Sequence, residues 1–304
     1  DEGNMTSDNL KKGNVKMELS SDDKKKIELT LDNGNLNCSK TSLGAYACTE
    51  VTPVKTITGL CVDDSSYAGN NGTVGINPVS FADDDWATIS AAAKSGNYEG
   101  KYNVGDTKEV DLGSLGKHTV RIANTSMPAE CSQEDFSQTA CGFVLEFVDI
   151  ITEHNIKSSA TNVGGWPSSN MRGYLTTDIY KALPADLQSI IIDTEVVSGH
   201  GSSDSSNFTS TDKLYLLELK EVYGGNEGTA YRTTRQLDYY SANGVTSSNC
   251  SGAIKQLNGS NSWWWLRAAY SDRSDDFCLA STYGGWVHDY ATSTRGVSPA
   301  FRIA

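Results

Sequence analysis

Residues 263–269 read WWWLRAA, and residues 296–303 read GVSPAFRI. Each tryptophan ring can bury a large apolar area, so three in a row predict an anchor for a core or a pocket. The residues between the two stretches are mainly tyrosine, serine, aspartate and glycine. A rigid apolar base beside such adaptable side chains is typical of a recognition surface. The region therefore predicts binding rather than catalysis.

The composition narrows the class of protein. The 304 residues suit one large or two medium domains. A net charge of −13 argues against nucleic-acid binding and against adsorption to anionic lipid. No run of eighteen apolar residues occurs, so no membrane insertion is expected. The polar start at Asp1 predicts an upstream leader or anchor outside this sequence.

Seven cysteines indicate an oxidising compartment, with buried free thiols as the alternative. Cys38 with Cys48, and Cys131 with Cys141, could each close a loop of about ten residues, which stabilises by about 2–3 kcal/mol. No CxxC spacing with paired histidines occurs, so no metal and no cofactor are expected. The odd number leaves at least one thiol unpaired or joined to another chain. Three cysteines have no predicted role: Cys61, Cys250 and Cys278.

Residues 1–75 are predicted to form a small β-rich N-terminal region. Apolar residues alternate at 15–19 and 27–31, and Asp32-Asn33-Gly34 predicts a hairpin turn between strands. The Gly/Ser/Asn-rich stretch 63–75 predicts a linker, which places the domain boundary at residue 75. The second domain, 76–304, follows.

Helices and strands are both predicted in the second domain, so the fold class is α+β. Residues 82–96 predict a helix with an aspartate N-cap, Ser168 or Ser169 caps a second, and Pro184 opens a third. Residues 232–242 predict a fourth. Strands are predicted at 117–123, 214–217, 263–267, 277–282, 285–290 and 298–303. The apolar run 142–151 fits a strand or a helix, and a strand is preferred because it can pair with 117–123.

The tail motifs resemble a bacterial family, domain of unknown function 6273, whose members carry a WWLRSP-like strand and end on GVRPAF or GVRPAL. The resemblance covers roughly residues 100–304, and it departs from the family pattern at Ser298 and at Ala268-Ala269. The tail is also similar to the C-type-lectin fold shared by formylglycine-generating enzymes and bacterial hypervariable ligand-binding proteins. The resemblance implies a C-type-lectin-like C-terminal domain. Family members are often surface or pilin-like proteins, which implies a pilin-like origin for residues 1–75.

No lysine, glutamate, glutamine or methionine occurs from Asn258 to Ala304. The residue types that remain are those an asparagine codon yields when its adenines are randomised. Such randomisation is the mark of diversity-generating retroelements, which the resemblance links to C-type-lectin receptors. The alternative is that binding loops and buried strands are poor in lysine and glutamate anyway.

An enzyme is not expected, because no nucleophile, base or metal motif stands out. His118, His154, His200 and His288 are scattered, without HExxH or HxH spacing. An oxidase would need a cysteine partner for Cys278, and Cys250 is the one candidate near it in sequence. A calcium site at Asp272, Asp275 and Asp276 is the remaining alternative. Solvated loop carboxylates are the preferred explanation of these aspartates, because the EPN, QPD and WND motifs of calcium-dependent lectins are absent.

The predicted binding surface is the segment 268–294. Aromatic and arginine side chains dominate binding hot spots, and this segment is rich in them. Strand alternation predicts that Asp276, Cys278, Ala280, Trp286 and His288 face outward, and that Arg267 and Arg302 belong to the scaffold. The predicted ligand-binding residues are Ala269, Tyr270, Ser271, Asp272, Arg273, Ser274, Asp276, Ser281, Tyr283, Trp286, His288, Tyr290 and Thr292.

Two functions remain open at this point. The first is a secreted or cell-surface adhesin or receptor that binds a protein or glycan ligand and is anchored to a pilus or cell envelope. The second is a structural pilus or cell-envelope subunit, in which the same aromatic residues pack against a neighbour. Both predict an extracellular or cell-surface location.

Overall fold

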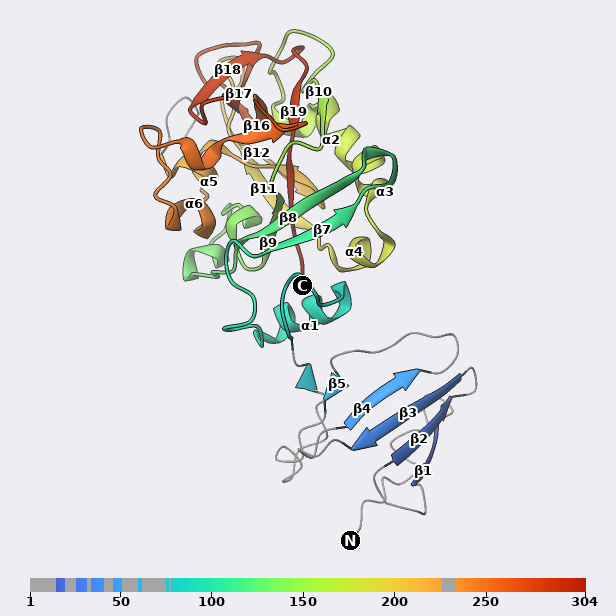
Figure 1. Ribbon diagram of the computed structural model, residues 1–304. Coiled ribbons are helices and arrows are strands. Elements are labelled where there is room, and N and C mark those ends of the chain that lie inside the picture. The colour runs from blue at the N-terminus through green and yellow to red at the C-terminus, as the bar shows by residue number, and fades with distance from the viewer. Residues whose placement is uncertain are drawn as a thin grey trace. The chain divides into compact units, whose positions relative to one another are not determined.

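The computed structural model describes residues 78–225 and 233–304, together with the backbone of six short strands before residue 77. The chain divides into two compact units, one of residues 1–79 with 95–97 and one of residues 80–94 with 98–304. Helices and several β-sheets are both present, which confirms the α+β class (Figure 1).

The first unit contains a four-stranded antiparallel sheet in the order β1-β2-β3-β4. Its strands are Val15–Leu19, Lys26–Leu31, Gly34–Lys40 and Tyr46–Glu50, and a two-stranded pair joins β5 (Leu60–Cys61) to β6 (Gly75–Ile76). Leu31 pairs with Gly34, as expected for a hairpin at the Asp-Asn-Gly turn. Cys38 and Cys48 are backbone partners across β3 and β4. Their side chains and that of Cys61 lie outside the described residues, as do the linker and any pilin-like feature, so those predictions stay predictions.

One five-stranded antiparallel sheet of the second unit has the order β13-β20-β9-β8-β7. The strands are β7 (Thr107–Asp111), β8 (Lys117–Asn124), β9 (Val144–Phe147), β13 (Tyr215–Leu216) and β20 (Pro299–Arg302). The apolar run at 142–151 therefore forms a strand, and β9 pairs with β8 as predicted. All four residues of β9 are buried, which explains why its sequence shows no alternation.

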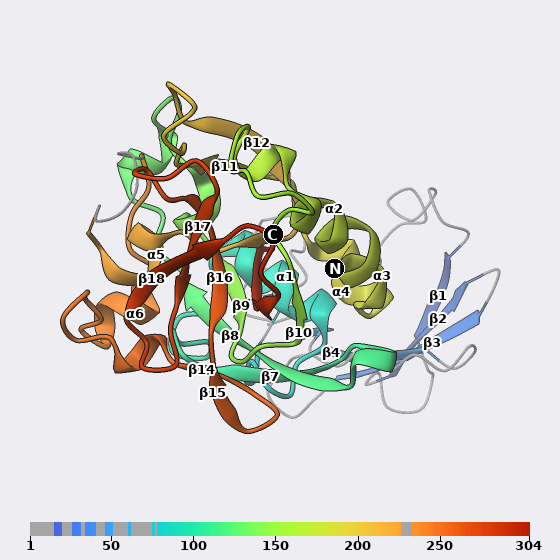
Figure 2. The same ribbon diagram turned by 90° about the horizontal axis from the view of Figure 1, so that it is seen from above.

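The other five-stranded sheet has the order β10-β19-β16-β17-β18, with β10 and β18 at its edges (Figures 1 and 2). Its strands are β10 (Thr152–His154), β16 (Trp264–Ala269), β17 (Asp276–Ala280), β18 (Trp286–Tyr290) and β19 (Arg295–Val297). Three predicted tail strands are thus confirmed. The fourth, predicted at 298–303, is also confirmed, because β20 (Pro299–Arg302) lies within it, although it belongs to the other five-stranded sheet. The short strand β19 before it was not predicted.

Gly296 of the tail motif is required by close packing. A Cβ atom there would lie 2.7 Å from the Trp263 carbonyl oxygen and 2.6 Å from Ile150 Cδ1. The Gly296 N–H donates to that same carbonyl at 2.9 Å, which joins β19 to the start of β16. Any larger residue would push the two strands apart.

Helix α1 (Trp86–Ser95) begins four residues later than predicted. Asp85 is its cap, since Asp85 Oδ1 accepts from the Thr88 N–H at 2.7 Å, while Ser80 and Asp83 form a separate turn before it. Helix α2 (Asn170–Tyr174) is capped by Ser169 as predicted, and continues through a π-helical turn (Leu175–Ile179) into α3 (Tyr180–Ala182). Helix α4 (Ala185–Ile190) follows Pro184.

The predicted helix 232–242 is shorter in the structure. Helix α6 covers only Asp238–Ala242, because the Leu237 N–H donates to the Glu221 carbonyl of α5 (Leu219–Tyr223) at 3.0 Å. Two hairpins complete the unit: β11 (Thr194–Ser198) with β12 (Phe208–Asp212), and β14 (Lys255–Leu257) with β15 (Ser260–Ser262). Short 3-10 turns occupy Gly113–Leu115, Ala129–Ser132, Gln138–Ala140, Trp166–Ser168 and Ser251–Ala253.

The core of the second unit is built on β16. Trp264 and Trp265 are fully buried, and each indole N–H is paired: Trp264 donates to the Ala253 carbonyl and Trp265 to the His154 carbonyl, both at 3.0 Å. At about 25 cal/mol per Å², each ring contributes about 4–6 kcal/mol of burial free energy. Both faces of β16 are covered, so alternation along this strand does not separate core from surface.

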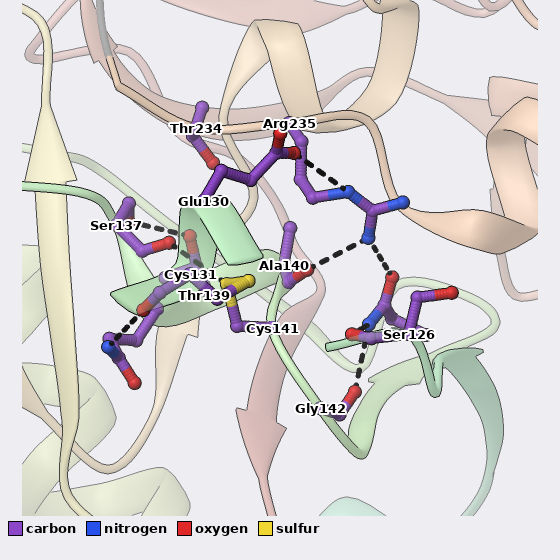
Figure 3. The surroundings of a disulfide bond; sticks show 12 residues. Ser126, Glu130, Cys131, Ser137, Thr139, Ala140, Cys141, Gly142, Thr234 and Arg235 are labelled. Carbon is purple, nitrogen blue, oxygen red and sulfur yellow. Dashed lines mark hydrogen bonds and ion pairs between the residues drawn. A yellow bond between two sulfur atoms is a disulfide. The ribbon is translucent and has the colours of Figure 1, made fainter. Parts of the chain in front are cut away.

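The predicted Cys131–Cys141 disulfide is present. It closes a loop beside Arg235, which lies between the Glu130 carboxylate and the Ala140 carbonyl (Figure 3). Cys131, Phe136 and Cys141 form a small apolar cluster of their own. The bridge thereby holds the segment that carries Ser137 and Thr139, two hydroxyls of the buried network described below.

Candidate functional site

An aromatic patch, defined as Tyr270, Trp286 and His288, lies on the edge strand β18 and the loop after β16. The Tyr270 ring stacks on the His288 ring with centroids 4.1 Å apart and planes within 8°. The Trp286 ring lies 6.4 Å from Tyr270. All three side chains are half-buried, so each keeps a solvent-facing part. The patch is therefore a fixed apolar surface that remains accessible.

Asp276 fixes the orientation of the imidazole in the patch. His288 Nδ1 lies 2.6 Å from Asp276 Oδ2, so Nδ1–H donates to the carboxylate, and Nε2 of the neutral ring is an acceptor. The Tyr270 hydroxyl lies 3.3 Å from Asp272 Oδ2. Partial desolvation and the Asp272 carboxylate raise the pKa of Tyr270 above its ordinary value.

Exposed residues surround the patch. The loop between β16 and β17 supplies part of this rim, and the two ends of β18 supply the rest. Tyr283, in the β17–β18 turn, is 83% exposed, and Tyr290, at the end of β18, is 55% exposed. The other predicted residues at the surface are Ser271, Asp272, Arg273, Ser274 and Thr292. The structure thus places ten of the thirteen predicted residues at the surface, on the edge strand β18, just beyond its two ends and in the loop after β16.

Three predicted contact residues are buried and are corrected here: Ala269, Asp276 and Ser281. The outward orientation predicted for Cys278 and Ala280 is also wrong, since both are fully buried. Strand β17 lies between β16 and β18, and Cys278 is the register partner of His288, whose ring stacks on Tyr270. The aromatic patch therefore covers the face of β17 that alternation alone assigns to solvent.

Asn162 is a site residue that the sequence reasoning missed. Its buried Nδ2 donates to the carbonyls of Arg273 at 2.9 Å, Asp276 at 3.0 Å and Tyr270 at 3.4 Å. Its backbone N–H donates to the Ser274 carbonyl at 2.7 Å. One side chain thus holds the loop that positions the patch. The sequence carries one trace of this packing, the glycine at position 201. A larger residue there would clash with Asn162, because a Cβ atom on Gly201 would lie 2.3 Å from the Asn162 side-chain amide.

A buried ion pair is centred on Arg267, in the interior of β16. Arg267 binds Glu221 through Nη1 at 2.7 Å and Nη2 at 2.5 Å, and also donates to the carbonyls of Val197 and Leu216. Glu221 also accepts from the hydroxyls of Thr139 and Thr234. Burial alone would raise the pKa of Glu221, but Arg267 outweighs it and holds the pKa below its ordinary value. The network supports the scaffold role predicted for Arg267.

A second buried network lies beside Trp264 and links β8 and β9 to β14 and α6. Glu146 accepts from Arg121 Nε and from Lys255 Nζ, each at 2.9 Å, and from the Tyr240 hydroxyl at 2.9 Å. Burial lowers the pKa of Lys255 to about 8, against the opposing effect of Glu146. Ser298 donates to the Phe147 carbonyl at 3.0 Å. The cations of this region are supplied by Arg121 and Lys255.

The remaining histidines have local partners. His118 Nε2 lies 2.9 Å from the Leu115 carbonyl, His154 Nδ1 lies 2.7 Å from that of Asn155, and His200 Nδ1 lies 2.8 Å from that of Gly201. Within residues 78–225 and 233–304, no group of three acidic, histidine or cysteine side chains is arranged to hold a metal ion. Across the same ranges, no helix has the length and apolar character needed to cross a membrane.

The fold and the patch define a disulfide-linked α+β protein with a surface aromatic cluster on a tryptophan-rich sheet. Residues 143–304 match the family described as Domain of unknown function (DUF6273), and the protein belongs to this family, as the tail motifs predicted. The matched region includes β9, the whole aromatic patch and the tail. No curated protein and no solved structure matches the chain.

Proposed function

We propose that the protein is a secreted or cell-surface ligand-binding protein whose segment 268–294 forms the binding surface. The observation that carries the proposal is the stacked Tyr270–His288 pair beside Trp286, half-exposed and ringed by exposed side chains. Tyrosine and tryptophan supply large contact areas at a low cost in conformational entropy. Such anchors within a polar rim are the arrangement found at binding hot spots.

The support beneath the patch favours recognition. A binding surface loses less entropy when its contact residues are already held in place. Asn162 holds the loop from Tyr270 to Asp276, and Asp276 in turn orients His288. The Nε2 atom of His288 is left as an acceptor for a ligand donor. A C-type-lectin-like fold for the second unit is part of the proposal, supported by the tail motifs and the β17–β18 hairpin that follows the WWLR strand.

Hypervariability through a diversity-generating retroelement belongs to the same proposal. The residue types between Asn258 and Ala304 support it, and the surface positions 270–274, 283 and 290 would be the ones that vary usefully. Sequencing the locus tests this part. A template repeat and a reverse transcriptase next to the gene are expected, and their absence would remove hypervariability while leaving ligand binding intact.

Binding itself is tested by probing the immobilised chain against a glycan array and a library of displayed surface proteins. Trp286→Ala and Tyr290→Ala are expected to abolish capture with little change in melting temperature. Met127→Ala is the matched control, because Met127 is also a large exposed apolar side chain but lies outside the patch. Equal loss of capture and of stability in the patch variants would favour the structural pilus or cell-envelope subunit instead.

A further inference from the structure

A second surface site lies at the opposite edge of the tryptophan-rich sheet. An open groove of about 540 Å³ separates the edge strand β10 from helix α2 and its π-helical extension. The two elements lie next to each other in both views (Figures 1 and 2). The groove is lined by His154, Asn155, Ser158, Ser169, Asn170, Gly173, Tyr174, Thr177 and Asp178. None of these residues belongs to the aromatic patch.

A stacked pair of rings forms one wall of the groove. The rings of His154 and Tyr174 lie 4.2 Å apart with planes within 10°. The His154 carbonyl accepts from the buried Trp265 indole at 3.0 Å, which fixes this wall to the core. His154 Nδ1 donates to the Asn155 carbonyl, so Nε2 is an acceptor. The groove therefore has a flat, rigid aromatic side with a hydrogen-bond acceptor on it.

Gly173 points independently to a ligand. A glycine inside a helix destabilises it by about 1 kcal/mol relative to alanine. Gly173 has no positive φ, and a Cβ there would meet nothing within 4 Å, so neither backbone conformation nor packing requires glycine. A remaining reason for glycine at this position is that it lets a ligand approach the helix backbone closely. The adjoining π-helical turn, which carries Thr177 and Asp178, is a feature often found at functional sites.

The lining also selects the chemistry of the ligand. Asp178 is the one carboxylate among the nine lining residues, and no lysine or arginine is among them, so the groove does not suit an anion. The Asn155 amide, the Ser158 hydroxyl and the Asp178 carboxylate offer hydrogen bonds to hydroxyl groups. A ligand ring with an apolar face and hydroxyl groups at its edge fits this groove, because the face can lie on the aromatic wall while the hydroxyls bond to the polar side chains. We propose that this groove binds the pyranose ring of a neutral saccharide.

The test uses the full chain and a panel of methyl pyranosides of glucose, galactose, mannose and N-acetylglucosamine, observed by saturation-transfer NMR. At least one glycoside is expected to bind, with a dissociation constant on the order of 1 mM. Gly173→Gln fills the groove and is expected to weaken binding at least about tenfold without lowering the melting temperature, since glutamine favours helix over glycine. Thr176→Gln is the matched control, because Thr176 is exposed on the same π-helical turn but does not line the groove.

Tyr290→Ala, in the rim of the aromatic patch, is expected to leave glycoside binding unchanged, so failure of this proposal and failure of the proposed function are separate results. Asn155→Ala provides a second variant of the groove should Gly173→Gln fold poorly. Absence of saturation transfer from every glycoside would overturn the proposal. So would glycoside binding that neither groove variant weakens, or binding of choline in place of all the glycosides.

Discussion

Replacing Asn162 by alanine tests whether one side chain holds the binding loop. The substitution removes three hydrogen bonds from Nδ2, at 2.9, 3.0 and 3.4 Å, and leaves the carbonyls of Tyr270, Arg273 and Asp276 without this donor. The amide carries two protons, so two full bonds are counted, and about 0.5–1.5 kcal/mol for each gives a total of about 1–3 kcal/mol. Local opening of the loop should therefore increase by about 5- to 150-fold.

Amide hydrogen exchange measures this opening directly. The reporters are the Tyr270 N–H, which donates to the Asp276 carbonyl, and the Ser202 N–H, which donates to the Arg273 carbonyl. Both should lose protection in Asn162→Ala, while amides of β8 and β9 should keep theirs. Asn261→Ala is the control, because this exposed asparagine makes two hydrogen bonds at the surface, to the Thr282 carbonyl and from Gln256 Nε2, and neither reaches the loop. Unchanged protection at Tyr270 and Ser202 would refute the role assigned to Asn162.

Three further predictions concern stability, measured by urea unfolding. Arg267→Met should lower the free energy of unfolding by about 3–5 kcal/mol, because it leaves the Glu221 carboxylate buried without its cation. The double variant with Glu221→Met should recover part of that loss. A double variant no more stable than Arg267→Met would contradict this account. The pKa values of Glu221 and Glu146 are lowered in the folded chain, so below about pH 4.5 the unfolded chain binds more protons than the folded chain. The free energy of unfolding should therefore fall steadily as the pH falls. A free energy of unfolding that rises on acidification would contradict this prediction. Replacing Cys131 and Cys141 by serine should lower the free energy of unfolding by about 2.7 kcal/mol, because the unfolded chain regains the entropy that closing a loop of sequence separation 10 removes. A change near zero would show that the disulfide does not stabilise the fold.

Much of the secondary structure follows from local pattern. Asp85 and Ser169 act as caps because their side chains accept from the third residue along, and that spacing is readable in sequence. The Cys131–Cys141 disulfide could also be predicted, because the two cysteines are close together in the sequence. The cluster of Tyr270, Trp286 and His288 could be anticipated because its members lie on adjacent segments of one hairpin.

The errors arose where long-range packing decides burial. Alternation tells which residues share a face of a strand, but not what lies over that face. Cys278 and Ala280 are buried because rings from neighbouring segments cover β17. Asn162 lies more than a hundred residues before the loop it holds, so no local spacing marks it. The strand predicted at 298–303 formed, but local sequence did not show that it joins a second sheet, nor that residues 295–297 form a separate strand beside β10 and β16.

The division of the tail has a consequence for synthesis in the cell. Strand β19 lies between β10 and β16, and β20 lies between β13 and β9, so both are interior strands. Residues 295–302 leave the ribosome after every strand they join. Until they emerge, each sheet has a gap beside one of its edge strands, with unpaired backbone and exposed apolar side chains, and such surfaces favour aggregation. Neither five-stranded sheet can therefore be completed before residues 295–302 have been synthesised.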